Sequence, residues 1–385
     1  MKTLHIEDFD AIAFGNDHTN TLGVIQSLSI EKIRVLPLIW GERTGILKKS
    51  KFVKRFIAKA NSDDCITFLK SNIPLKRIVI IPCCDEAATK LDFFRKDISS
   101  NFLFQFSTKY QISKLFEKEF QTNLASENTL LVPQTFFLNK IEELPTTFVF
   151  PGIIKPRVSF KGSKSQIKIV NDKKEAISFL KEHNQDSLNN FVIQEYTTKK
   201  NDVSFCGCSL KNGSIILPGI QTKKRIYPEM TGLGTIYLTA DCKNEVLLNS
   251  IKNLIKSTGF VGLFSVEFAE TEKGEFYFFE FNLRNDGGNV CYTESNKNII
   301  YYHYCDMLDL SFDGQQEIKS TTIIHPIRHF LSFYHGNISK AIWKRDLKEK
   351  DKYMFTVGND KRPIWHAFTR IFLLKAKLIN KKMYK

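Results

Sequence analysis

The stretch from residue 276 to residue 289 reads FYFFEFNLRNDGGN. Its aromatic residues favour a β-strand, in which Glu280, Asn282 and Arg284 stand at alternate positions. Because alternate side chains of a strand share one face, we expect a carboxylate, an amide and a guanidinium to point the same way. The residues between them are apolar and are expected to bury the opposite face: Phe279, Phe281 and Leu283.

A second acid precedes this strand. Glu267 lies in the apolar stretch GFVGLFSVEFAE, and the turn-forming pair Lys273-Gly274 separates the two stretches. In the hairpin that this spacing predicts, Glu267 stands beside Glu280, with Asn282 one alternate position further along. Three hard oxygen ligands on two rigid strands suit magnesium, which keeps part of its shell for water and phosphates. Arg284 would offer a bidentate fork to a phosphate or carboxylate beside the metal.

The first hundred residues alternate strand-like apolar runs with helical ones, with helices expected over 21–29 and 62–71. This alternation predicts a parallel sheet with helices on its faces. The turn FGNDHTNTLG ends a strand and opens a helix, as a ligand-binding turn would. It lacks both GxGxxG and the lysine of a P-loop, so a structural turn is favoured over a nucleotide site.

Further helices are expected from about residue 107 to 120, over 172–183 and over 243–257. Between the first two, FVFPGIIKPRVSFKGSKSQIKIV reads as two strands joined by a loop around Gly162, with Lys155 on the first strand. Such a loop of Ser, Lys and Gly can fold over a polyanion. A plain hairpin with solvated lysines is the alternative interpretation.

Composition narrows the class of protein. The chain has 385 residues, of which 42% are hydrophobic and 25% charged, so it is expected to fold into two or three packed units. Eight scattered cysteines show no zinc spacing and are expected to be reduced and mostly buried. The start MKTLHIEDFD is not a signal peptide and no apolar run reaches membrane length, which predicts a cytoplasmic protein. The net charge of +15 suits a nucleic acid, an acidic membrane or a polyphosphate ligand.

Taken together, Glu267 and Glu280-Phe281-Asn282-Leu283-Arg284 resemble the magnesium triad and following arginine of the ATP-grasp enzymes. Within that superfamily, the chain resembles the carboxylate–amine ligases, which include D-aspartate ligase-like and carbamoyl-phosphate synthase-like proteins. The resemblance covers about residues 10–310. It implies an α/β protein, α+β in the ATP-grasp part, with an N-terminal Rossmann-like pre-ATP-grasp domain followed by an ATP-grasp fold that has a mobile lid subdomain.

The resemblance also assigns roles to individual residues. It implies that Lys109, Lys155 and Gly162 contact phosphate, that Lys223 and Arg225 supply further catalytic cations beside Arg284, and that Glu267, Glu280 and Asn282 bind metal. The stretch VIQEYTTKKNDVS is similar to the adenine hinge of the family, which implies nucleotide contacts for Gln194, Glu195, Tyr196, Thr197 and Asp202. The chain departs from the family pattern in the glycine-poor loop VSFKGSKS and at Asp286, which follows the arginine.

The implied reaction is ATP-dependent ligation of a carboxylate to an amine through an acyl phosphate. The implied cofactors are ATP and Mg²⁺, with two ions expected and Mn²⁺ as a substitute. Small-molecule carboxylate and amine substrates are the expected partners, and the resemblance leaves open a homodimer. Two alternatives remain: an ATP-grasp relative without catalysis that acts as a nucleotide-binding or scaffold protein, and a nucleic-acid-binding protein. The absence of RNP-like or helix-turn-helix motifs disfavours nucleic acid.

The expected domains are 1–106, 107–310 with a lid over about 146–197, and a C-terminal extension over 311–385. The end of the extension, 361–385, is basic and places five apolar residues on one helical stripe: Ile364, Trp365, Phe368, Ile371 and Phe372. Such a segment can lie on the cytoplasmic face of an anionic membrane. A terminal helix docked on its own domain is the favoured alternative.

Overall fold

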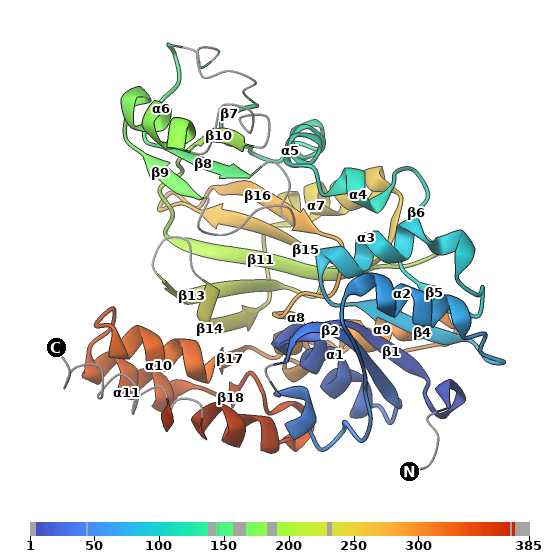
Figure 1. Ribbon diagram of the computed structural model, residues 1–385. Coiled ribbons are helices and arrows are strands. Elements are labelled where there is room, and N and C mark those ends of the chain that lie inside the picture. The colour runs from blue at the N-terminus through green and yellow to red at the C-terminus, as the bar shows by residue number, and fades with distance from the viewer. Residues whose placement is uncertain are drawn as a thin grey trace.

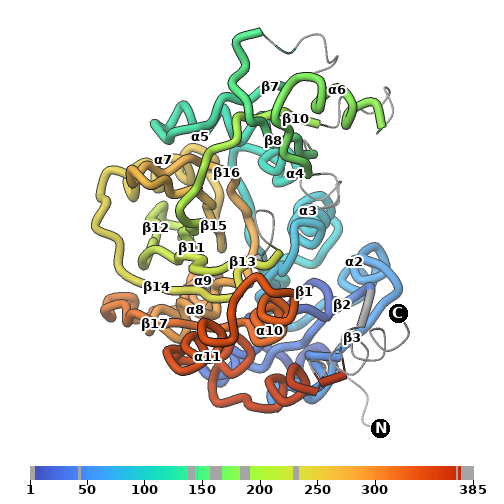
Figure 2. The backbone as a smooth tube through the Cα atoms, turned by 90° about the vertical axis from the view of Figure 1, so that its left-hand side faces the viewer, coloured from blue at the N-terminus to red at the C-terminus, as the bar shows by residue number. Residues whose placement is uncertain are grey.

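A computed structural model of the chain describes residues 5–43, 45–137, 144, 146–156, 167–182, 191–228, 233–369 and 372–373. Three β-sheets organise these residues. Figures 1 and 2 show a small sheet and the N-terminal sheet at opposite ends of the molecule, with the largest sheet between them. Within the described ranges, every helix is too short or too polar to span a bilayer.

The N-terminal sheet consists of five parallel strands in the order β3-β2-β1-β4-β5. Its strands are β1 (Ala11–Asp17), β2 (Val35–Arg43), β3 (Ile57–Lys59), β4 (Ile78–Pro82) and β5 (Phe102–Phe104), and its helices are α1 (Thr19–Ser29), α2 (Ser62–Ser71) and α3 (Asp85–Phe93). All of β4 and nearly all of β1 is buried, as expected for parallel strands covered on both faces. The predicted Rossmann-like domain is confirmed.

The small sheet is antiparallel, in the order β7-β10-β8-β9, and together with α6 we call it the lid. Its elements are β7 (Thr135–Phe136), β8 (Gly152–Pro156), β9 (Lys168–Val170), α6 (Lys173–Glu182) and β10 (Phe191–Glu195). Ile154, Phe179 and Phe191 form part of a separate small core beneath α6. The loop between β8 and β9, which includes Gly162, lies outside the described residues.

The largest sheet has the path β16-β15-β11-β13-β14-β17-β18, with β12 paired to β11 and β6 paired to β15. Its strands are β6 (Phe106–Ser107), β11 (Asn201–Ser209), β12 (Ile215–Ile216), β13 (Ile220–Tyr227), β14 (Leu233–Ala240), β15 (Phe260–Glu270), β16 (Phe276–Asn282), β17 (Thr321–Ile324) and β18 (Lys352–Tyr353). All pairs are antiparallel except β17 with β18. The predicted mixture of a parallel α/β part and an α+β part is thus confirmed.

Helices cover this sheet, and α7 (Glu245–Thr258) shows why they form. Its Leu247, Ile251 and Leu254 recur at helical spacing and are buried, and Gly259 ends the helix with a φ of 64°. The other helices of this part are α4 (Ile112–Leu115), α5 (Lys118–Glu127), α8 (Asn289–Glu294), α9 (Ile299–Met307), α10 (Pro326–Tyr334) and α11 (Lys340–Glu349). Short 3-10 helices span Ile6–Asp8, Leu47–Lys49, Arg95–Asp97 and Val357–Asn359.

The helix expected from about residue 107 to 120 is broken into α4 and α5. The backbone leaves the helical region at Glu117, with ψ near 125°. Gln121 compensates, because its side-chain nitrogen donates to the carbonyls of Leu115 and Phe281 at 2.8 Å each. The break places Lys118 at the start of α5, beside the hairpin of β15 and β16.

The segment after residue 310 is hydrogen-bonded into the largest sheet. β17 pairs with β14, with Ile236 opposite Ile324 and Tyr237 opposite Ile323. Figure 2 shows α10 and α11 beside β17, and α10 packs against β13 and β14. Further on, the fully buried Asp360 accepts a hydrogen bond from Gln26 at 3.1 Å. The extension is therefore an integral part of the fold.

The C-terminal stripe is divided where the structure describes it. A helix covers 362–369, and Ile364 is buried against the domain core. Trp365 and Phe372, in contrast, are 67% and 72% exposed. The described residues of the stripe therefore do not all face the core, because the helix packs through Ile364 and Ala367. Ile371 and most of the terminal lysines lie outside the described residues.

Candidate active site

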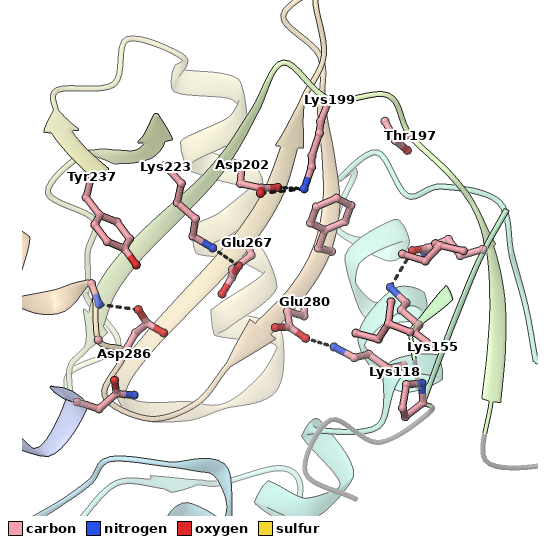
Figure 3. A pocket seen from close by; sticks show the side chains of 18 of the residues that line it. Lys118, Lys155, Thr197, Lys199, Asp202, Lys223, Tyr237, Glu267, Glu280 and Asp286 are labelled. Atoms are coloured by element: carbon pink, nitrogen blue, oxygen red, sulfur yellow. Dashed lines mark hydrogen bonds and ion pairs between the residues drawn. The ribbon is translucent and has the colours of Figure 1, made fainter. Parts of the chain in front are cut away.

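A cavity of about 480 Å³ lies where the lid, the largest sheet, the β1–α1 turn and α10 meet. Figure 3 shows side chains of the largest sheet, such as Lys223 and Glu267, facing Lys118 and Lys155 across it. Among the described residues, six lysine and arginine side chains and five carboxylates line its wall. The cavity therefore combines opposite charges in a small volume, as a site for a metal-bound polyphosphate requires.

The hairpin of β15 and β16 places two acids side by side. Glu267 and Glu280 are opposite each other in the antiparallel register, and both line the cavity. A bulge follows this pair, because Phe268 is opposite Phe278 rather than Phe279. Phe279 therefore turns toward the cavity, and Phe278 takes the buried position. The expected burial of Phe279 on the opposite face is wrong for this reason.

The third residue of the expected metal triad lies deeper. Asn282 is opposite Ser265, is 3% exposed and is not part of the cavity wall. Its side-chain nitrogen has no hydrogen-bond partner among the described residues. No group of three or more His, Cys, Asp or Glu in those residues is arranged as a metal site. The donor set for a cation is thus two facing carboxylates with a buried amide beyond them.

Lys118 and Lys155 form the lid side of the cavity (Figure 3). Lys118 makes an ion pair with Glu280, and Lys155 donates a 2.8 Å hydrogen bond to Gln194. Burial alone would raise the pKa of Glu280, but the charge and hydrogen bond of Lys118 lower it to about 2. Burial, followed by the charge of Lys118, lowers the pKa of Lys155 to about 7.

Two of the expected cations lie elsewhere. Lys109 is exposed, close to Gly259, and is not part of the cavity wall. Arg225 donates to the buried Asp346 at 2.6 Å and also lies outside the wall. Neither residue is therefore among the side chains that the structure brings together in this cavity. Lys118 stands where Lys109 was expected, because the helix break turns α5 toward Glu280.

The residues of the expected adenine hinge all line the cavity: Gln194, Glu195, Tyr196, Thr197 and Asp202. They follow β10 into β11, so the chain crosses from the lid to the largest sheet along this wall (Figure 3). Apolar side chains of Ile153 and Phe279 contribute to the same wall. Lys199 is paired with Asp202 at 2.7 Å. This wall offers backbone and apolar surface suited to a planar ring.

A second set of paired charges lies across the cavity from the lid (Figure 3). Lys223 pairs with Glu267 at 2.7 Å. Although burial lowers the pKa of Lys223, Glu267 and Tyr237 raise it well above its normal value. Lys223 therefore stays protonated across the physiological range.

Arg284 is held by two carboxylates. Its Nε donates to Asp85 at 2.9 Å and its Nη1 to Asp286 at 2.9 Å, so one partner comes from α3 of the N-terminal domain. The Arg284 side chain is 13% exposed. The two carboxylates thus fix the orientation of the Arg284 guanidinium. One of them, Asp286, is the residue that departs from the family pattern.

The remaining wall was not predicted from the sequence. His18, Thr19 and Asn20 come from the β1–α1 turn, and Arg328 comes from α10. The turn, interpreted as structural, belongs to the site because it follows the carboxyl end of a central parallel strand, where such sheets bind ligands. That position was a usable signal. No sequence signal indicated Arg328, since it lies beyond the part of the chain that resembles a family.

Comparison with family models and with curated proteins found no match. Solved structures are similar at low identity. The biotin carboxylase domain dimer of a 2-oxoglutarate carboxylase from Hydrogenobacter thermophilus, with MgADP, ADP and bicarbonate, is 15% identical (TM-score 0.64; 82% of this chain and 73% of that chain). The N5-carboxyaminoimidazole synthetase from Staphylococcus aureus, complexed with ADP, is 15% identical (TM-score 0.63; 81% of each chain). An L-amino acid ligase from Bacillus licheniformis is 12% identical (TM-score 0.59; 81% and 78%). At these identities the likeness concerns the fold alone, and the chain shares the fold of these solved structures.

Proposed function

We propose that this protein is an ATP-dependent carboxylate–amine ligase. The observation that carries the proposal is the pair of facing carboxylates, Glu267 and Glu280, flanked by lysines from both sides within one cavity of an ATP-grasp fold. Phosphoryl transfer needs positioning and charge neutralisation more than a covalent nucleophile, and this wall supplies both.

The donor set fits a hard divalent cation. Both carboxylates face the cavity, and Asn282 adds an amide that lacks a partner among the described residues. Glu280 is held ionised by its lowered pKa. Glu267 and Glu280 would hold Mg²⁺, as one or two ions, or Mn²⁺ in its place, and the metal would neutralise phosphate charge there.

The nucleotide would lie along the crossing from β10 to β11. Ile153 and Phe279 offer apolar surface to the base, and Asp202 lies within reach of a ribose hydroxyl on the same wall. Lys118, paired with Glu280, and Lys155, which donates to Gln194, lie on one side of the cavity, where they would hold phosphate oxygens (Figure 3). Lys118 takes the role that Lys109 was expected to have.

When bound, ATP supplies the phosphoryl group that activates the carboxylate. A carboxylate oxygen bonds to the terminal phosphorus as the bond to ADP breaks, and the amine nitrogen then bonds to the acyl carbon as phosphate leaves and the nitrogen loses a proton. Arg284, fixed by Asp85 and Asp286, orients the carboxylate and stabilises the developing charge. Exclusion of water from the cavity during the reaction would limit competing hydrolysis.

A pairwise screen of amino acids for ADP release tests this proposal, with Glu280→Gln as the variant and Glu272→Gln, in the exposed turn before β16, as the control. We expect magnesium-dependent ADP release that Glu280→Gln abolishes and Glu272→Gln preserves. Unchanged release in Glu280→Gln would refute the metal assignment. Binding of ATP without turnover over the whole screen would favour a nucleotide-binding protein without catalysis.

A further inference from the structure

One cation of the cavity differs from the rest. Among the described residues, five of the six lysine and arginine side chains in the wall have a side-chain partner: Lys118, Lys155, Lys199, Lys223 and Arg284. The guanidinium of Arg328 has no hydrogen bond or ion pair within the same part of the chain. A guanidinium that lines a cavity without a side-chain partner can bind an anionic group of a ligand.

The fold holds Arg328 in place. It lies in the first turn of α10, where the backbone N–H of Arg328 donates to His325 Nδ1 at 3.3 Å and Pro326 opens the helix. The backbone of His325 in turn donates to the Thr235 carbonyl at 2.9 Å, next to the β14–β17 pairing. The arginine is therefore presented by a sheet-anchored helix rather than by a loose terminus.

The groups around Arg328 leave its charge uncompensated. His18 and Tyr237 are its titratable neighbours in the cavity, and His325 lies behind it. Burial and then the charge of Arg328 lower the pKa of His18, which is therefore neutral at pH 7. Asp286, a carboxylate of the same cavity wall, already accepts from Arg284 and from the backbone of Gly288.

At this end of the cavity two segments of the chain lie close together. A Cβ at Gly287 would lie 2.5 Å from Asn20 Oδ1, so the turn after Arg284 and the β1–α1 turn meet there without spare room. Figure 3 shows Tyr237 and Asp286 on the side of the cavity opposite Lys118 and Lys155. A ligand group beside Arg328 is therefore separated from Lys118 and Lys155 by the breadth of the site.

We infer that Arg328 binds a second anionic group of the substrate, a carboxylate or a phosphate distinct from the carboxylate that is activated. The inference rests on the proposed function and names its substrate class: a small acid with two anionic groups. The activated carboxylate belongs near Arg284 and the facing acids, whereas Arg328 offers a guanidinium fork at the far end. The C-terminal extension thus selects the substrate.

Calorimetric titration tests this inference with three matched pairs of probes: aspartate and asparagine, glutamate and glutamine, and phosphoserine and serine. Each is titrated into the full chain with and without magnesium and a non-hydrolysable ATP analogue. The variants are Arg328→Gln and Arg328→Lys, and the control is Arg362→Gln, an exposed arginine of the same extension outside the cavity wall.

We expect at least one acidic probe to bind about 10- to 100-fold more tightly than its neutral partner, as for a hydrogen bond to a charged group. Arg328→Gln removes this preference, Arg328→Lys keeps part of it, and Arg362→Gln keeps all of it. The probe pair whose acidic member binds more tightly shows whether Arg328 binds a carboxylate or a phosphate. Affinity for the ATP analogue stays unchanged in every variant.

Three results would overturn the inference: no preference for acidic probes in the wild type, a preference that Arg328→Gln retains, or a loss of ATP-analogue affinity in Arg328→Gln, which would make the arginine a nucleotide ligand. Arg328→Lys guards against a folding defect, since melting temperatures equal to wild type are expected for it. The proposed function can fail separately: an acid preference without nucleotide binding or ADP release would retain the anion site and reject the ligase.

Discussion

Lys155 makes the binding of ATP depend on pH. Burial and the charge of Lys118 lower its pKa from 10.5 to about 7, so half of the free protein lacks this proton at neutral pH. Phosphate oxygens favour the protonated lysine, which returns its pKa toward the normal value in the complex. Binding therefore takes up a proton, and affinity falls as pH rises through 7.

The magnitude follows from this shift. Between pH 7 and pH 9 the protonated fraction of Lys155 falls from about one half to about one hundredth, so affinity for an ATP analogue falls by about fiftyfold, by proton linkage. The Lys155 side chain is partly exposed to solvent, so the fiftyfold change is an upper bound. His18 does not contribute, since burial and Arg328 place its pKa below this range.

The assay is titration of a non-hydrolysable ATP analogue with magnesium at pH 7, 8 and 9. Lys155→Met should bind more weakly at pH 7 and lose most of the pH dependence. Lys223→Met is the matched control, because the raised pKa of Lys223 keeps it charged throughout, so that variant should weaken binding by the same factor at every pH. An equal pH slope in wild type and Lys155→Met would refute the reasoning.

Three further predictions concern the other cations. Lys118→Met should weaken binding of an ATP analogue by about tenfold or more, as for loss of a charged hydrogen bond, while Lys109→Met leaves it unchanged. Calorimetry measures both affinities. Weaker binding in Lys109→Met than in Lys118→Met would restore the sequence-based assignment. Arg225→Met should lower the free energy of unfolding by about 3 kcal/mol, with kcat retained, because it removes the nearest ion-pair partner of the buried Asp346. An unchanged free energy of unfolding in denaturant titration would contradict this. Arg284→Lys should reduce turnover by about a hundredfold at unchanged ATP affinity, since an ammonium cannot replace its fork; lost ATP affinity with full turnover would make it a nucleotide ligand.

Local sequence patterns predicted a good part of the site. The pairing of Glu267 with Glu280 follows from strand periodicity and a short turn, both of which act over a few residues. The helix expected over 62–71 is observed with these bounds, and in the structure Asn61 caps its first turn. These features depend on neighbours in the chain.

The rest depends on contacts between distant segments. The bulge that turns Phe279 into the cavity is a property of the pairing between two strands, and no residue type in β16 predicts it. The choice of Lys118 over Lys109 is decided by a helix break that Gln121 stabilises through β16. Arg328 reaches the cavity only because β17 joins β14.

Trapping of the activated acid tests the central claim most directly. The wild-type protein is incubated with ATP, magnesium, hydroxylamine and one acid at a time from a panel of amino acids and dicarboxylates, and hydroxamate and ADP are measured together. We expect at least one acid to give hydroxamate and ADP in equal amounts, and Glu280→Gln to give neither. ADP released without dependence on any acid, and without hydroxamate, would contradict a ligase that proceeds through an acyl phosphate.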